Sequence, residues 1–341
     1  MPRLNLAFLA LLTLSANSFA DTGEGIDLTE TKRSFPISEK VVEDEFFGTE
    51  RFYALETEIL SVKTSNSSFF SSAALRYGLD IKADSGSKNF SNQTGVSAYF
   101  NALSTLKVLD ENLDYKFPSQ LKIVIDRYTE TPWAVDAGRM QVSEAGYIRN
   151  EGLIAFSPAS ENSTSLAKSI DIVAHEIAHA VVANTSQLDT SIGSKLINEA
   201  FADIIGVYVE SKLNDSGWNW KIGEASYHDQ LSCHRDIHDP EDPILLRHTS
   251  NVTEDDGIYV LSGIVTTSFY YLATGEDLHG VEILPKSNMD TLVKLYFDVV
   301  TKDLSSSVKV KDLKEALIER AKLQAPELEQ RILRAFELVG M

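Results

Sequence analysis

The spacing of hydrophobic residues divides the chain into a mixed first half and a helical second half. In the first half, Glu56–Val62 and Leu121–Asp126 have the apolar content of strands, and Ser97–Leu113 repeats apolar residues at helical spacing. In the second half, the same spacing predicts a series of helices, at about 168–184, 194–213, 262–273, 288–302, 309–323 and 325–338. The pattern therefore predicts an α+β protein in which strands precede helices.

The first twenty residues have the features of a secretory signal peptide. Arg3 supplies the positive charge, Leu4–Leu14 forms a short apolar core, and Ser18-Phe19-Ala20 is a small-x-small cleavage site. The apolar run is shorter than the about 20 residues that a membrane span needs. The only cysteine, Cys233, lies far from this site, so no lipid-anchor cysteine follows it. We expect a secreted or periplasmic protein without a transmembrane helix.

The residues that remain after cleavage suffice for two domains. We expect an N-terminal α+β domain at 21–165 and a helical domain at 166–341, with the boundary just before the helix predicted at about 168–184. A single cysteine excludes an intramolecular disulfide framework, so stability must come from packing or from bound metal ions.

The chain is strongly acidic. With 50 acidic and 31 basic residues its formal net charge is −19, which disfavours nucleic acid as a partner because phosphates would be repelled. The acidity fits the solvated surface of an exported protein, and it also leaves open that some carboxylates gather around calcium. Composition says nothing about the oligomeric state.

The sequence His175-Glu176-Ile177-Ala178-His179 is the first candidate for chemistry. Residues four apart share one face of a helix, so both imidazoles can reach one ion. The surrounding helix is apolar nearly all round, and buried histidines need a polar partner, for which a metal ion is suited. Zinc accepts neutral histidines and keeps one position for water in catalytic sites, and Glu176 is placed to take a proton from that water.

A second acidic motif follows in the next predicted helix. Glu199 comes twenty residues after His179 and can complete a set of two histidines and one carboxylate. Asp203 lies one helical turn further on the same face, where it can accept the free N–H of a ligand histidine and fix its tautomer. The sequence therefore predicts one catalytic zinc ion, bound by His175, His179 and Glu199.

These two motifs and their separation resemble the thermolysin family of neutral zinc metallopeptidases. That family also has His-Glu-x-x-His, nineteen intervening residues and then Glu-Ala-x-x-Asp. The similarity covers about 120–341 and is loose over 21–119, so we expect a divergent member with a short N-terminal region that lacks the family's long pro-region. It implies the two-domain gluzincin fold: a β-rich N-terminal domain, a mainly helical C-terminal domain and a zinc cleft between them. The reaction implied is hydrolysis of internal peptide bonds in peptides or proteins.

The resemblance also assigns further residues. It implies Arg235 as the group that holds the substrate carbonyl, and it places Tyr259 where the family has its transition-state histidine and Glu254 where the family has the aspartate that orients it. Residues on the substrate side would be Trp133, Ile172, Ile222 and His234. Possible ligands of a structural calcium ion are Asp171, Glu210, Asn219 and Glu224, while Lys221 disfavours a close pair of ions.

Two other functions are compatible with the sequence. The first is a zinc aminopeptidase, although the Gly-x-Met-Glu-Asn motif of that branch is absent. The second is a non-catalytic, zinc-binding interaction protein derived from a peptidase, which the change to Tyr259 would suit. Glu176 argues against this second function, because a purely structural zinc site needs no base.

Overall fold

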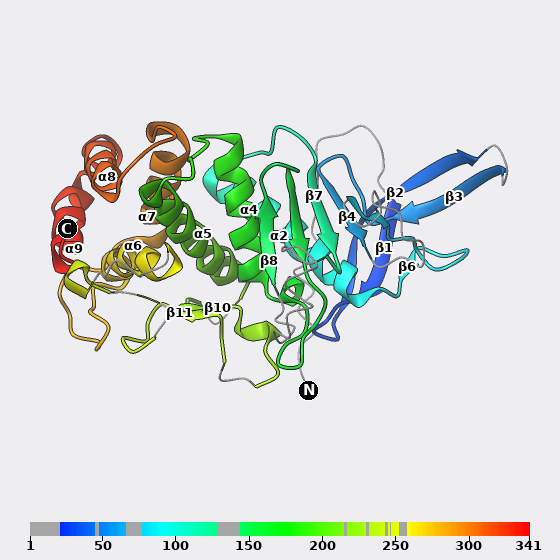
Figure 1. Cartoon of the computed structure of the whole chain (residues 1–341), viewed down its shortest axis with the longest axis horizontal. Coiled ribbons are helices and arrows are strands. Elements are labelled where there is room, and N and C mark those ends of the chain that lie inside the picture. The colour runs from blue at the N-terminus through cyan, green and yellow to red at the C-terminus, as the bar shows by residue number, and fades with distance from the viewer. Residues whose placement is uncertain are drawn as a thin grey trace.

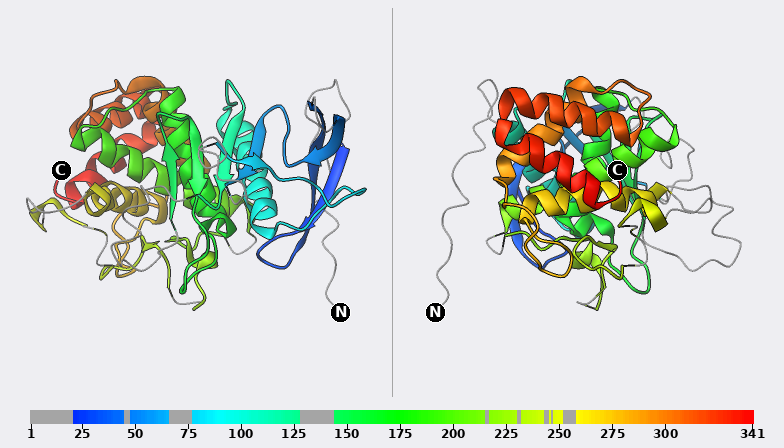
Figure 2. Two further views of the ribbon diagram at one scale, coloured as in Figure 1. Left: turned by 45° about the vertical axis from the view of Figure 1, so that its right-hand side comes forward. Right: turned by 90° about the vertical axis from the view of Figure 1, so that its left-hand side faces the viewer.

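The computed structural model describes residues 21–44, 48–65, 77–127, 144–214, 217–229, 232–242, 245, 247–251 and 258–341. The expected signal peptide at 1–20 lies outside these residues, as do Trp133 and Glu254. Strands β1–β3 lie at one end of the molecule and helices α8 and α9 at the other, as Figures 1 and 2 show. The chain thus has a β-rich N-terminal region and a helical C-terminal domain, as predicted.

The first sheet has four strands in the order β3-β2-β1-β6. Its members are β1 Asp21–Ile26, β2 Lys32–Asp44, β3 Gly48–Ala54 and β6 Asn89–Phe90. Neighbours β1, β2 and β3 are antiparallel, whereas β6 runs parallel to β1. The long β2–β3 hairpin extends away from the rest of the molecule at the right of Figure 1.

The second sheet has five strands in the order β5-β4-β7-β9-β8. They are β4 Leu60–Thr64, β5 Leu79–Asp80, β7 Leu121–Ile125, β8 Ala145–Ile148 and β9 Leu153–Phe156. The central strands β4, β7 and β9 are parallel, and β8 forms one antiparallel edge. Helix α2, Gln93–Leu113, and the first helix of the C-terminal domain pack against one face of this sheet.

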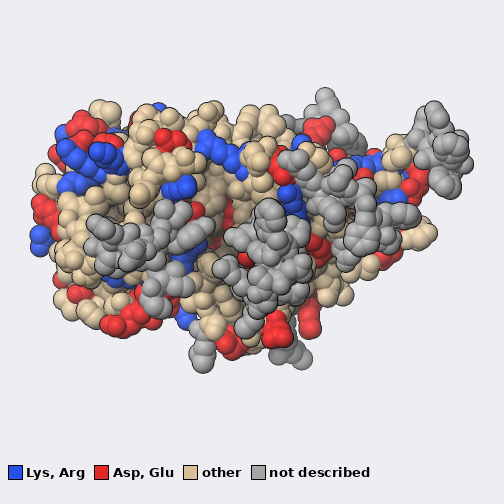
Figure 3. Space-filling model, in the orientation of Figure 1, with Lys and Arg blue, Asp and Glu red and all other residues tan. Residues whose placement is uncertain are grey.

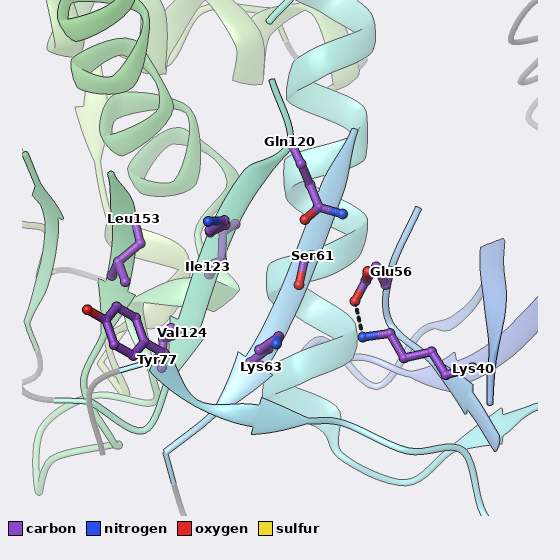
Figure 4. Close-up of a pocket in the computed structure, with 10 residues that line it drawn as sticks. Lys40, Glu56, Ser61, Lys63, Tyr77, Gln120, Ile123, Val124 and Leu153 are labelled. Carbon is purple, nitrogen blue, oxygen red and sulfur yellow. Dashed lines mark ion pairs between the residues drawn. The ribbon is translucent and has the colours of Figure 1, made fainter. Parts of the chain in front are cut away.

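The opposite face of the second sheet carries a smaller apolar cluster and a cavity. Val124, Leu153 and Ala155 form the cluster, separate from the main core. Beside it lies a cavity of about 240 Å³, lined by Lys40, Glu56, Ser61, Lys63, Tyr77, Gln120, Lys122, Ile123, Val124 and Leu153 (Figure 4). Its lysines are partly neutralised, for example by the ion pair between Lys40 and Glu56. None of the candidate catalytic, metal-binding or substrate-binding residues predicted from the sequence lines this cavity.

The C-terminal domain is built from packed helices. They are α4 Ile170–Asn184, α5 Ile192–Leu213, α6 Ile258–Thr274, α7 Met289–Asp298, α8 Val310–Gln324 and α9 Glu329–Leu338. A π-helical turn, η5 Val299–Asp303, follows α7, and short 3₁₀ turns are η2 Leu166–Lys168, η3 Glu224–Ser226, η4 Thr249–Asn251 and η6 Pro326–Leu328. The small strands β10 Lys221–Ile222 and β11 Arg235–Asp236 pair beside these helices.

Helices α4 and α5 approach each other closely at Gly206. A Cβ atom at this position would lie 2.8 Å from the carbonyl oxygen of Asp171, closer than real Cβ contacts. Glycine therefore allows the two backbones to touch, and this contact sets the distance between the motif on α4 and the motif on α5.

The surface reflects the acidic composition. On the face shown in Figure 3, acidic residues are most evident along the lower rim and basic residues along the upper one. None of the helices in the described ranges combines the length and the apolar content that a bilayer span requires.

Candidate metal centre

Helix α4 presents both motif histidines to one point. Their Nε2 atoms lie 3.1 Å apart, and the ring planes are nearly perpendicular. Glu199 reaches the same point from α5: its Oε2 lies 3.5 Å from Nε2 of His175 and its Oε1 3.6 Å from Nε2 of His179. One ligand atom of each residue lies within 4.8 Å of the others. The structure thus brings together the three residues predicted to hold one metal ion.

The unsatisfied atoms at this point fit a metal ion. Glu199 is only 9% exposed, yet its Oε2 accepts no hydrogen bond from any described group. Such a buried polar atom normally has a partner. Two nitrogens bound to a tetrahedral zinc ion at about 2.05 Å each would lie about 3.3 Å apart, close to the observed separation. The donor set of two imidazoles and one carboxylate is one that zinc accepts in catalytic sites.

Asp203 stands behind the histidine pair. Its Oδ1 lies 2.9 Å from Nδ1 of His175 and 3.1 Å from Nη2 of Arg235, and all three side chains are nearly inaccessible to water. A charged Asp203 favours the imidazole tautomer that carries its proton on Nδ1 and turns the lone pair of Nε2 toward the ion. The predicted position of Asp203 behind a histidine ligand agrees with this geometry.

Charges around the centre keep Glu199 ionised. Burial alone would raise the pKa of its carboxyl, but His179, His175 and Arg235 lower this pKa to about 2. In the absence of an ion, burial would lower the pKa of His175, whereas its contacts with Asp203 and Glu199 raise this pKa to about 10. The pocket therefore favours positive charge at the point where the three donors meet.

Glu176 lies on α4 directly after the first histidine. Its side chain is 6% exposed, and its Oε2 has no hydrogen-bond partner among the described residues. A buried carboxylate oxygen without a donor beside a metal site is placed to accept a proton from a water or to bind one.

The carboxylates assigned to calcium form a second acidic group, near the start of α4, where Asp171 lies in the first turn. Oδ1 and Oδ2 of Asp171 accept hydrogen bonds from the backbone N–H groups of Ile172 and Gly223. Burial, and then the charge of Glu224, raise the pKa of Asp171 to about 7. Burial, and then the charges of Asp171 and Glu224, raise the pKa of Glu210 to about 8. The carboxylates of Asp171, Glu210 and Glu224 thus repel each other.

Side chains at the edge of this acidic group show how little of its charge is neutralised. Asn219 is exposed and donates a hydrogen bond from Nδ2 to Oε1 of Glu224, at 2.6 Å. The ammonium of Lys221 lies 3.9 Å from Asp236. The carboxylates, together with the amide oxygen of Asn219, remain candidates for binding a cation.

The structure brings three of the predicted substrate residues together. Ile172 and Ile222 are buried, and a Cβ atom built on Gly223 would contact both Ile172 and His234. His234 is exposed, and its backbone N–H donates to the carbonyl of Ile222. Tyr259 lies in the first turn of α6, but the structure does not describe its side chain.

Strand β8 is a feature that the sequence analysis missed. It packs beside α4 and forms the outer edge of the second sheet, so one row of its backbone groups has no strand partner among the residues that the structure describes (Figure 1). Two short apolar segments, Ala145–Ile148 and Leu153–Phe156, flank the turn at 149–152, and this hairpin signal could have revealed it.

Comparison with known proteins agrees with the fold and with the helical C-terminal domain. Residues 186–341 match the model of the thermolysin metallopeptidase alpha-helical domain. Bacillolysin of Bacillus cereus is 30% identical over 165 residues, which is 46% of this chain and 29% of that protein. Thermolysin of Alicyclobacillus acidocaldarius is 30% identical over 158 residues, 45% of this chain and 29% of that protein. The match therefore spans less than a third of these relatives.

Among solved structures, the precursor of protealysin, a metalloproteinase from Serratia proteamaculans, superimposes with a TM-score of 0.64 at 17% identity. The superposition covers 84% of this chain and 89% of that one. The chain thus resembles this metalloproteinase in its fold. The likeness to the thermolysin-type family is carried by the helical domain, whose family model matches somewhat less than half of the chain.

Proposed function

We propose that the protein is a zinc endopeptidase that cleaves internal peptide bonds. The observation that carries this proposal is the convergence of His175, His179 and Glu199 on one point, while Oε2 of the neighbouring Glu176 has no hydrogen-bond partner among the described residues. A site that serves only to stabilise the fold needs no such base. Since the match spans less than a third of the curated relatives, the activity rests on this geometry.

A zinc ion bound by these donors would polarise the carbonyl of the peptide bond and lower the pKa of a water molecule. Glu176 would accept the proton of that water and then donate it to the leaving amine. Asp203 would hold the His175 ring in its orientation, and Arg235 would hold Asp203 through their 3.1 Å contact. Contact between Arg235 and the substrate carbonyl stays part of the proposal, as does a hydrogen bond from Tyr259 to the transition state.

The position of β8 suggests where the substrate would lie. An extended peptide can pair with an open sheet edge through backbone hydrogen bonds, with pockets for alternate side chains. Strand β8 offers such an edge beside α4, the helix that carries both histidines. The group of Ile172, Ile222 and His234 would receive a substrate side chain, and the exposed imidazole adds a polar group to an otherwise apolar surface. Trp133, also assigned to the substrate, lies outside the described residues.

Two further parts of the proposal concern stability and location. A calcium ion at Asp171, Glu210, Asn219 and Glu224 would relieve the repulsion that raises the pKa of Asp171 and Glu210. Export to the periplasm or the medium would follow from cleavage of the signal peptide proposed at 1–20.

The test is the variant Glu176→Gln, assayed with zinc-loaded protein against a library of peptides with blocked N-termini. Because Glu176 would act on water without binding the ion, we expect unchanged zinc content and melting temperature but peptide hydrolysis lower by at least about 10². Cleavage-site profiling by mass spectrometry measures the loss.

Three results would contradict parts of the proposal. Retained activity of Glu176→Gln would remove its role as base, and loss of zinc would make it a ligand. Cleavage by the unmodified protein of free N-termini alone would favour the aminopeptidase.

A further inference from the structure

We propose that Arg149 is a positioning residue, which holds the edge strand β8 at a fixed distance from the helices of the metal centre. This inference rests on the proposed function, because it assigns to β8 the role of substrate edge. Arg149 directly follows β8, in the turn that leads to β9.

The guanidinium of Arg149 bridges the two halves of the molecule. Its Nη1 donates to the carbonyl oxygen of Leu188 at 2.5 Å, and its Nη2 donates to that of Gln187 at 3.1 Å. Both carbonyls belong to the connection between α4 and α5, the two helices that carry the metal donors. A planar guanidinium can satisfy two neighbouring acceptors at once, which fixes direction as well as distance.

The connection that receives Arg149 is itself firmly anchored. The backbone N–H of Gln187 donates to the carbonyl of Val182 in α4, and that of Asp189 donates to the carbonyl of Ser306. Leu188 is only 1% exposed. A movement of these carbonyls would therefore require the end of α4 to move with them.

The turn that carries Arg149 is rigid as well. Glu151 and Gly152 both donate from their backbone N–H groups to the carbonyl of Ile148. The largely buried ion pair between Arg127 and Glu151, at 2.8 Å, ties the turn to the residues that follow β7. Arg149 thus joins two stiff segments.

Strand β8 is less deeply buried than its neighbour β9, although Ala145 and Tyr147 pack against the core. None of its four residues is fully buried, whereas all four residues of its neighbour β9 are. Its hydrogen bonds to β9 fix its register but leave it free to tilt about that ladder. The two hydrogen bonds of Arg149 to the α4–α5 connection restrain this tilt at the C-terminal end of β8. Productive geometry at a reacting bond is sensitive to displacements of about 1 Å.

The test compares Arg149→Ala and Arg149→Lys with the control Asn150→Ala, an exposed neighbour in the same turn for which the structure records no hydrogen bond to the α4–α5 connection. The zinc-loaded full chain is used throughout. Hydrogen exchange of the β8 amides should be about tenfold faster in Arg149→Ala, with α4 unaffected. Lysine can reach one carbonyl at a time, so Arg149→Lys should lie between the unmodified protein and Arg149→Ala.

Kinetics separate positioning from general stability. For a long peptide that would pair along β8, KM should rise about tenfold in Arg149→Ala, while a short blocked dipeptide should be cleaved at a nearly unchanged rate. Unchanged exchange at β8, or equal losses for both substrates, would overturn the inference. If the unmodified protein cleaves no peptide, the proposed function fails, while the exchange experiment still decides whether Arg149 holds β8.

Discussion

At the scale of single residues, we expect Asp203 to act on the proposed metal centre through His175, without contacting the ion. Its carboxylate lies 2.9 Å from Nδ1 of His175, and it is completely buried. We expect Asp203→Asn to lower zinc affinity by about 10- to 100-fold, the usual effect of losing a carboxylate behind a ligand histidine. Competition with a fluorescent zinc chelator measures the affinity. If the variant loses zinc affinity only because it is less stable, as shown by a matching fall in its melting temperature, Asp203 does not have this role.

The control for that variant is Asp290→Asn, which removes a carboxylate in the first turn of α7, beside Lys212 in the last turn of α5. Asp290 accepts from Lys212 and from Tyr208 but has no contact with the metal ligands. Its replacement should leave zinc affinity unchanged within about twofold, because exposed ion pairs contribute little. An equal effect of both variants would show that net charge, and not the contact with His175, determines affinity.

At the scale of elements, the contact of α4 with α5 determines whether the donors meet. Gly206→Ala would place a Cβ atom 2.8 Å from the carbonyl oxygen of Asp171. Alanine favours a helix by up to about 1 kcal/mol over glycine, but forcing the helices apart costs about 1–3 kcal/mol. We expect a net lower free energy of unfolding and weaker zinc binding, measured by urea denaturation and chelator competition. A more stable variant would show that the helices can separate at no cost.

The matched control on the same helix is Lys195→Ala, at an exposed position near the start of α5. Its free energy of unfolding should stay within about 0.5 kcal/mol of the original, as for most exposed positions. Zinc affinity should not change, since this residue lies outside the α4–α5 contact.

The sequence predicts an element well where residues within that element determine its start and end. The helix at 97–113 is confirmed as α2, although it begins at Gln93, because Asn92 caps it by accepting from the N–H of Gly95. The strand expected at Glu56–Val62 is wrong at its start: the N–H of Thr57 donates to the carbonyl of Leu60, so residues 57–60 form a turn and β4 begins at Leu60. Turn chemistry without glycine or proline leaves little trace in a hydrophobicity pattern.

The cluster of candidate metal ligands was predictable because helical spacing brings these residues together. His175 and His179 are four apart on one helix, and Asp203 is one turn after Glu199 on another. Arg149 could not be predicted in the same way. Its partners are backbone carbonyls of Gln187 and Leu188, and a carbonyl is present at every residue, so no side chain in the sequence identifies them.

At the scale of the whole molecule, we expect stability to depend on pH because buried carboxylates lie close together. Asp171 and Glu210 have raised pKa values in the folded protein, about 7 and about 8, because both are buried near each other and near Glu224. Their pKa values in the unfolded chain are about 4. Between these limits the folded protein binds more protons than the unfolded one, so stability is greatest at the acidic side and falls as pH rises.

We therefore expect the free energy of unfolding of calcium-free, zinc-loaded protein to decrease from about pH 5 to about pH 8 through these two groups. Calcium should oppose this loss, since an ion that binds only the folded state adds about 2.7 kcal/mol at a hundred times its dissociation constant. Urea denaturation at a series of pH values, with and without millimolar calcium, measures both effects. In Glu210→Gln, the decrease should be smaller and the calcium effect weaker, whereas Asp290→Asn should behave like the original protein. Equal stability at pH 5 and pH 8 without calcium would show that the three carboxylates do not oppose each other, and no response to calcium would leave this acidic group without a cation.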